Sequence, residues 1–298
     1  TTGNAQQLAV QTAVWVPGGG ATANDVSINQ TTNLAAAANN GFVNQVGANA
    51  ALVFGARATI YQNITGIAVA EDNIVQAFGN LGLGVGNGAR YTQVIMGGAN
   101  STDGSIFQLG GNLAGVPGAA FTGVRSNQSV LFSAIAGDDV LQIGGNAVFA
   151  QNGATLGQEI GMAADAEDVG QVAGNFATAG NNFAANQAIA LTVESDDGNV
   201  AQIAGNLFVD RNLAGNTNSR LGQLISAQST GSDNTLQLFG NFAFLNHNAG
   251  NSEYTVAQAN IANATADTAI GQFQTNTVFW ELNADGALGQ DIDGRAQA

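Results

Sequence analysis

Polar and apolar residues alternate along this chain around a repeated marker, a Gln followed four residues later by an Asn. Successive marker Gln residues are 31, 32, 34, 29, 31, 35 and 35 residues apart. This even spacing predicts a tandem repeat with a period of about 32 residues. The eight copies contain Gln45, Asn49, Gln76, Asn80, Gln108, Asn112, Gln142, Asn146, Gln171, Asn175, Gln202, Asn206, Gln237, Asn241, Gln272 and Asn276.

The residues around each marker have the period of a β-strand. The position after the Gln is apolar in every copy, the third position is Gly in six copies, and the fifth and seventh are mostly large and apolar. These odd offsets lie on one face of a strand, and the Gln and Asn lie on the other. A helix would scatter the apolar set, so the pattern predicts a strand. We expect stacking of the repeats to bury this apolar face.

A second, weaker strand is predicted 16 to 21 residues after the marker Gln, often opened by another Gln, as at Gln62, Gln128 and Gln187. The connectors are rich in Gly, Asn and Ser, which is typical of turns. A unit of two short strands cannot bury an apolar face alone, so the units must stack. The predicted fold class is therefore all-β: a β-solenoid of about eight stacked two-strand β-arch coils, each of about 32 residues.

Three regions follow from this pattern. Residues 34–282 hold the solenoid repeats. Residues 1–33 are expected to be either a capping coil or a strand exchanged with a neighbouring subunit, with the glycine-rich loop 17–20 as its hinge. Residues 283–298 are expected to be a polar tail or cap.

Amide side chains suit a stack because each one both donates and accepts hydrogen bonds. Equivalent residues of successive coils lie about 4.8 Å apart, so Gln on Gln and Asn on Asn can form continuous ladders. A column of Lys or Glu would repel itself. The sixteen marker residues are therefore the expected ladder and assembly residues.

The charge balance narrows the possible partners. Charged residues make up only 9% of the chain, and six Arg with no Lys face 21 acids, for a net charge of −15. Nucleic acid and anionic membrane surfaces are therefore not expected partners. No apolar run reaches the length that a membrane helix needs, so membrane insertion is not expected.

Catalytic chemistry is not expected either. The single histidine, His247, lies between two Asn residues in a predicted turn, and the six Arg residues do not cluster with paired acids. The chain has no Cys, so it has no disulfide and no thiolate metal site. We therefore expect no enzyme activity and no cofactor, with calcium as the one alternative.

The calcium alternative rests on a repeated acid. An Asp stands three to six residues before each marker Gln from the second copy onward, in the incoming turn. One interpretation is a solvated turn residue; the other is a row of carboxylates that binds Ca²⁺. The residues are Asp72, Asp103, Asp138 with Asp139, Asp168, Asp197, Asp233 and Asp267.

Two stretches resemble a known repeat. Residues 73–80 (NIVQAFGN) and 232–241 (SDNTLQLFGN) resemble the curlin-type repeats of bacterial curli fibres, which are rich in Gly, Asn and Gln and poor in charge. The Gln-to-Asn spacing is four residues here and five in the curlin pattern. The resemblance implies a secreted β-solenoid that polymerises end to end into an amyloid-like fibre.

These observations predict a self-assembling extracellular structural protein that forms a fibre or a cell sheath. Its main partner would be further copies of itself, with an unidentified anchor at the cell surface. The chain begins with Thr1, which fits a secreted protein whose signal peptide has been removed. The alternative is a monomeric secreted adhesin or binding module on the same solenoid.

Overall fold

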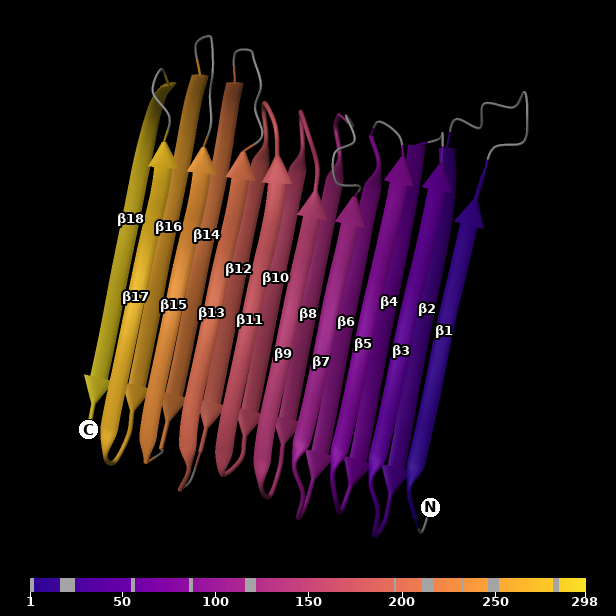
Figure 1. Cartoon of the computed structure of the whole chain (residues 1–298), viewed down its shortest axis with the longest axis vertical. Coiled ribbons are helices and arrows are strands. Elements are labelled where there is room, and N and C mark those ends of the chain that lie inside the picture. Colours follow the sequence, from indigo (N-terminus) through magenta and orange to yellow (C-terminus); the bar gives the residue numbers. More distant parts are fainter. Residues whose placement is uncertain are drawn as a thin grey trace.

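The computed structural model describes residues 3–16, 25–54, 57–85, 88–115, 122–195, 197–210, 217–231, 233–245, 252–280 and 284–298. All the regular secondary structure in these ranges is β-strand, arranged as two parallel nine-stranded sheets that lie face to face (Figure 1). The two strands at one end of the stack come from the N-terminus, and the two at the other end come from the C-terminus (Figure 1).

The odd-numbered strands form the first sheet in sequence order. They are β1 (Ala5–Trp15), β3 (Val43–Phe54), β5 (Ile74–Val85), β7 (Ile106–Gly115), β9 (Asp139–Phe149), β11 (Asp168–Ala179), β13 (Asn199–Asp210), β15 (Asn234–Leu245) and β17 (Ala269–Trp280).

The even-numbered strands form the second sheet, also in sequence order. They are β2 (Asp25–Ala38), β4 (Arg57–Ala70), β6 (Arg90–Ser101), β8 (Arg125–Ile135), β10 (Thr155–Asp165), β12 (Ala184–Glu194), β14 (Thr217–Thr230), β16 (Ser252–Thr265) and β18 (Ala284–Gln297).

Each coil therefore consists of one odd strand and one even strand that run in opposite directions in facing sheets. Neighbours within a sheet are parallel and in register, so Gln171 pairs with Gln142 on one side and with Gln202 on the other. The fold class predicted from the repeat, an all-β solenoid of about eight turns with a spacing of about 32 residues, is confirmed.

The ends of the chain belong to the same stack. Strand β1 pairs with β3, and its Gln7 and Gln11 lie in the places of the marker Gln and Asn. The predicted boundary after residue 33 falls inside β2. Residues 284–297, expected as a polar tail or cap, form β18, which pairs with β16. The predicted hinge at 17–20 lies outside the described residues.

The expectation that stacking buries the apolar odd offsets is wrong. The marker Gln and Asn point between the sheets, whereas the residue after the Gln points outward, with exposed fractions of 41% at Leu109 and 43% at Ile203. The inward positions often carry Ala or Gly, so the outward set has the higher hydropathy in the sequence. Burial of the amides is possible because their polar atoms are hydrogen-bonded.

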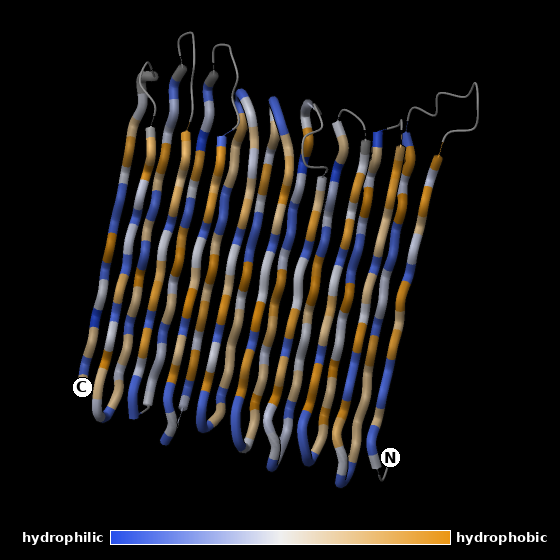
Figure 2. Tube along the Cα trace, viewed as in Figure 1, coloured by the Kyte–Doolittle hydropathy of each residue, from blue (hydrophilic) through white to orange (hydrophobic). Residues whose placement is uncertain are grey.

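Three apolar clusters fill the rest of the interior, one near each end of the strands and one at mid-height. The central cluster contains Ile64, Ile95, Val130, Ile160 and Ile189. The amide residues lie between the clusters, so polar and apolar layers alternate in the interior along the strand direction. Figure 2 shows hydrophilic and hydrophobic residues interspersed along every strand.

Two buried tyrosines donate hydrogen bonds to polar groups within this interior. The Tyr91 hydroxyl donates to the carbonyl oxygen of Gly84 at 3.2 Å, and the Tyr254 hydroxyl donates to Asp210 Oδ2 at 2.7 Å. Burial raises the pKa of Tyr91 to about 12. Both hydroxyls therefore have acceptors within the core.

Aromatic rings occupy space that glycines leave open in the interior. A Cβ added at Gly66 would lie 2.1 Å from Phe78 Cζ, and one added at Gly110 would lie 2.6 Å from Phe132 Cζ. The two sheets can therefore hold these rings without moving apart. Glycine is required at these inward positions for steric reasons.

We expect Gly66→Ala to lower the free energy of unfolding by about 1–3 kcal/mol, because the new methyl group overpacks the core against Phe78. Gly79→Ala is the matched control, since an added Cβ there meets nothing within 4 Å. Urea unfolding followed by circular dichroism measures both. Equal stability of the two variants would contradict this account of the packing.

Candidate functional site: amide ladders and the open ends of the stack

The marker Gln residues form a continuous hydrogen-bonded column in the odd sheet. Each Nε2 donates to Oε1 of the Gln in the preceding coil, over 2.7–3.0 Å, from Gln45 to Gln7 through to Gln272 to Gln237. The second N–H donates to a backbone carbonyl oxygen of the facing even strand, as from Gln171 to Thr192 at 3.2 Å. Each amide therefore ties two coils together and also ties the two sheets together.

The marker Asn residues form a second column with the opposite direction. Each Nδ2 donates to Oδ1 of the Asn in the following coil, over 2.8–3.1 Å, from Asn49 to Asn80 through to Asn241 to Asn276. The same nitrogen also donates across the interior, as from Asn146 to the carbonyl oxygen of Glu159 at 2.9 Å. All sixteen marker residues thus lie in these two columns.

A third column, in the even sheet, was not recognised from the sequence as a ladder. Its Nε2 atoms donate to Oε1 of the preceding member over 2.7–3.0 Å. A Gln 13 to 15 residues before each marker Gln is the signal that would have found it. The members are Gln30, Gln62, Gln93, Gln128, Gln158, Gln187, Gln223, Gln258 and Gln290.

The third column is offset by half a coil from the first. Each even-sheet Gln from Gln30 to Gln258 donates its second N–H to a carbonyl oxygen of the next odd strand, five residues after that strand's marker Gln. Examples are Gln30 to Ala50 at 3.0 Å and Gln258 to Thr277 at 3.3 Å. Within the described residues, Gln290 makes only the bond to Gln258, because β18 is the last strand.

The two ends of the stack present complementary amide atoms. At the head end (β1 and β2), Gln7 and Gln30 each donate one Nε2–H to a facing carbonyl oxygen, which leaves the other N–H directed out of the stack. At the tail end (β17 and β18), no described residue donates to Oε1 of Gln272 or Gln290. In both Gln columns, donors are therefore open at the head and acceptors at the tail.

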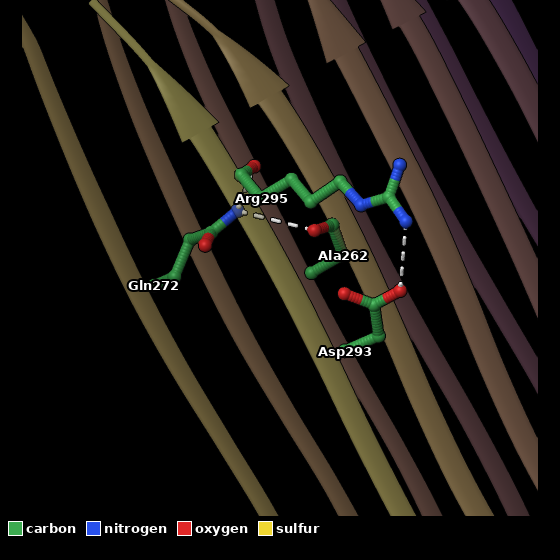
Figure 3. A network of polar contacts seen from close by, with 4 residues as sticks. All are labelled: Ala262, Gln272, Asp293 and Arg295. Atoms are coloured by element: carbon green, nitrogen blue, oxygen red, sulfur yellow. Dashed lines mark hydrogen bonds and ion pairs between the residues drawn. The ribbon is translucent and has the colours of Figure 1, made fainter.

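Backbone and surface groups surround the tail end of the first column. Gln272 donates to the carbonyl oxygens of Arg295 in β18 at 3.1 Å and Ala262 in β16 at 3.5 Å (Figure 3). Arg295 and Asp293 form an ion pair at 3.4 Å on β18 (Figure 3). These charged residues stand at odd offsets from Gln290, so they belong to the outer face of the sheet.

No known protein family, curated protein or solved structure matches this chain. The resemblance to curlin-type repeats therefore stays a prediction that rests on the motif. Among the described residues, no helix is long and apolar enough to cross a membrane.

The arches that lead from even to odd strands lie along the lower edge in Figure 2. The repeated Asp residues lie in these arches or open the next strand, as Asp139 and Asp168 do, and all of them are exposed. Asp168 Oδ1 accepts a hydrogen bond from the backbone N–H of Asn199 at 2.6 Å, in the next coil. No group of three or more His, Cys, Asp or Glu among the described residues is placed to hold a metal ion. Calcium binding by this row stays a prediction. His247 lies outside the described residues.

Proposed function

We propose that this chain is a self-assembling structural protein whose solenoid continues from one copy to the next, forming an extracellular fibre or sheath. The observation that carries the proposal is the complementarity of the ends: both Gln columns have donors open at the head and acceptors open at the tail. A tail stacked on a head extends both ladders without changing their direction.

The strand registers allow this continuation. With β17 beside β1 of the next copy, Gln272 Oε1 faces the open N–H of Gln7, and with β18 beside β2, Gln290 Oε1 faces that of Gln30. Asn276 Nδ2 then faces Gln11 of the next copy, which follows the reversed direction of the Asn column. All three ladders therefore meet compatible partners.

The half-coil offset supports the same junction. Every even-sheet Gln before Gln290 donates to a carbonyl oxygen five residues after the next marker position. In a continued stack the corresponding atom is the carbonyl oxygen of Thr12 in the next copy, five residues after Gln7. That copy completes the hydrogen-bonding pattern of Gln290.

The edge strands favour addition of another copy. Proteins that remain monomeric usually protect their sheet edges with Lys, Pro or inward-pointing charges. Neither β1 nor β17 contains Pro or any charged residue, and Asp291, Asp293 and Arg295 of β18 belong to the outer face. A location outside the cell agrees with the absence of Lys and the presence of only six Arg, which leave few sites for trypsin-like proteases.

The proposal is tested by microscopy and fibre diffraction of the purified chain. Nine strands per sheet at ~4.8 Å give each copy an axial length of about 43 Å, so we expect unbranched filaments with a ~4.8 Å meridional reflection and a repeat of about 43 Å. A monomer that persists at high concentration, without filaments, would overturn the proposal.

A further inference from the structure

Between offsets −1 and +7 from the marker positions, the outer face of the odd sheet carries no charge, and Asp139 and Asp168, at offset −3, stand at its rim. This apolar face consists of the residues at offsets −1, +1, +3, +5 and +7 from each marker position, five in each of nine strands, or 45 residues, and none of them is Asp, Glu, Lys, Arg or His. Large apolar side chains there are exposed, including Leu109, Val172, Ile203 and Phe273. A surface of this kind, much larger than the exposed apolar patches usual on monomers, marks an interaction site.

The outer face of the even sheet is different. At the same offsets from its own Gln column it carries Glu159, Asp165, Glu194, Asp291, Asp293 and Arg295. Three arginines, Arg90, Arg125 and Arg220, stand just before these offsets, and all three are exposed. The two faces therefore differ in chemistry although their backbones are alike.

We propose that the apolar face pairs with the apolar face of a second copy. Each copy has a net charge of −15, so two copies repel each other wherever their charged surfaces approach. The apolar face is the broad surface on which two copies meet without desolvating a charge. The identity of the two surfaces fits an isologous pair related by a two-fold axis.

The size of the face is sufficient for a stable pair. Nine residues at ~3.3 Å and nine strands at ~4.8 Å make it roughly 30 Å by 43 Å, or on the order of 1,300 Å² per copy. Stable protein interfaces bury about 800 Å² per partner. The face therefore exceeds the area that a specific dimer requires.

The apolar face has raised and hollowed parts that suit packing against a second sheet. Paired rings form ridges, with centroids 5.5 Å apart for Phe149 and Phe176 and 4.7 Å apart for Phe244 and Phe279. Beside these rings runs a column of glycines at offset +3, where a Cβ added at Gly145 would meet only a backbone oxygen, at 3.8 Å. Side chains of the partner sheet occupy this furrow, as facing sheets interdigitate at a separation of about 10 Å.

The pairing does not depend on the proposed end-to-end growth. It is tested on an end-blocked chain that carries Gln7→Glu and Gln30→Glu, in which both open head-end donors are replaced by carboxylates. We expect this chain to sediment as a dimer. Adding Ile203→Glu, which places a charge in the apolar face, is expected to weaken the dimer roughly 100-fold.

The matched control is Leu224→Glu in the same background. Leu224 follows its Gln as Ile203 does, and their exposed fractions are 40% and 43%, but Leu224 lies on the opposite sheet. We expect its dimer affinity to be unchanged. Equal weakening by both substitutions, or a monomer at all concentrations of the end-blocked chain, would overturn the pairing.

A second variant separates pairing from folding. Gly145→Val with Gly174→Val fills the furrow, and the added Cβ atoms meet nothing closer than 3.8 Å within the chain. Valine favours strands more than glycine does, so the protomer is expected to keep its melting temperature while the dimer is lost. Dimers that survive this substitution would also contradict the pairing.

The unmodified chain distinguishes this inference from the proposed function. Filaments with the mass per length of two stacks are expected if both hold. Filaments made of single stacks would contradict only the pairing. Dimers that do not form filaments would contradict only the end-to-end proposal.

Discussion

Gln171→Glu is expected to lower the free energy of unfolding by at least ~4 kcal/mol at neutral pH, a large part of the 5–15 kcal/mol that stabilises most domains. Gln171 is fully buried and donates to Gln142 Oε1 at 2.8 Å and to the carbonyl oxygen of Thr192 at 3.2 Å. A carboxylate cannot donate, so both acceptors lose their partner at a cost of about 1–3 kcal/mol each. The buried negative charge adds a desolvation cost.

The decrease in the free energy of unfolding caused by Gln171→Glu is expected to depend on pH. Burial raises the pKa of the introduced carboxyl above its unfolded value of about 4.3. The folded state then binds a proton more tightly than the unfolded state, so stability falls as pH rises between the two pKa values. At pH values below the unfolded pKa, the carboxyl is protonated and can donate to Gln142. The loss in free energy of unfolding is then smaller.

The control for this prediction is Gln228→Glu, which makes the same chemical change at an exposed position of β14. It is expected to change stability by no more than ~0.5 kcal/mol. Denaturant unfolding of both variants in the end-blocked chain, from acid to neutral pH, measures the difference. A Gln171→Glu chain as stable as Gln228→Glu would show that the ladders contribute little to stability.

Filament growth is expected to need roughly 100-fold more protein after Gln7→Glu with Gln30→Glu. In the unmodified junction, two Nε2–H groups of the head meet Gln272 Oε1 and Gln290 Oε1 of the tail. The substitutions put carboxylate oxygens against these amide oxygens. Two lost hydrogen bonds of about 1.5 kcal/mol each correspond to this factor.

The head-end substitutions are compared with Asn29→Asp and Asn33→Asp, which add the same two charges. Both residues are exposed on β2, in the same terminal coil, but they point to the outer face. The critical concentration, measured by sedimentation, is expected to be nearly unchanged in this control. If both double variants raise it equally, net charge rather than the ladder contact governs growth.

The repeat could be predicted from the sequence because one residue of each coil is nearly invariant in type. The marker Gln set the number and spacing of the coils, and the alternation around Gln171 or Gln237 identified strands. In-register parallel stacking requires equivalent residues to be alike, since each one contacts its counterpart in the next coil. The repeat length and the strands of a solenoid of this kind can therefore be predicted from its sequence.

The inward face could not be predicted by hydropathy. Ile203 and Leu109 point to solvent while Gln202 and Gln108 are fully buried, because an amide with all its hydrogen bonds made can replace an apolar side chain in the core. The sequence also could not show which glycines are required by packing. Gly66 is required by the ring of Phe78, whereas Gly79, three residues after its marker Gln, has open space above it.

The open atoms at the two ends of the stack could not be predicted from the sequence either. The even-sheet Gln column follows arches of variable length, so its regular spacing is visible only when counted backward from the next marker. The direction of each ladder depends on how the amides are rotated, which no sequence pattern records. Together these two features decide which atoms are open at Gln7 and Gln290.

The fixed direction of the ladders has a kinetic consequence for any polymer of this chain. In both Gln columns, a copy added upside down would set oxygen against oxygen at the tail or N–H against N–H at the head, so it could not be incorporated. The two tips of a filament would differ in growth rate, and a molecule that covers Gln272 and Gln290 would arrest elongation at one tip only. Two broken filaments could rejoin in a single orientation.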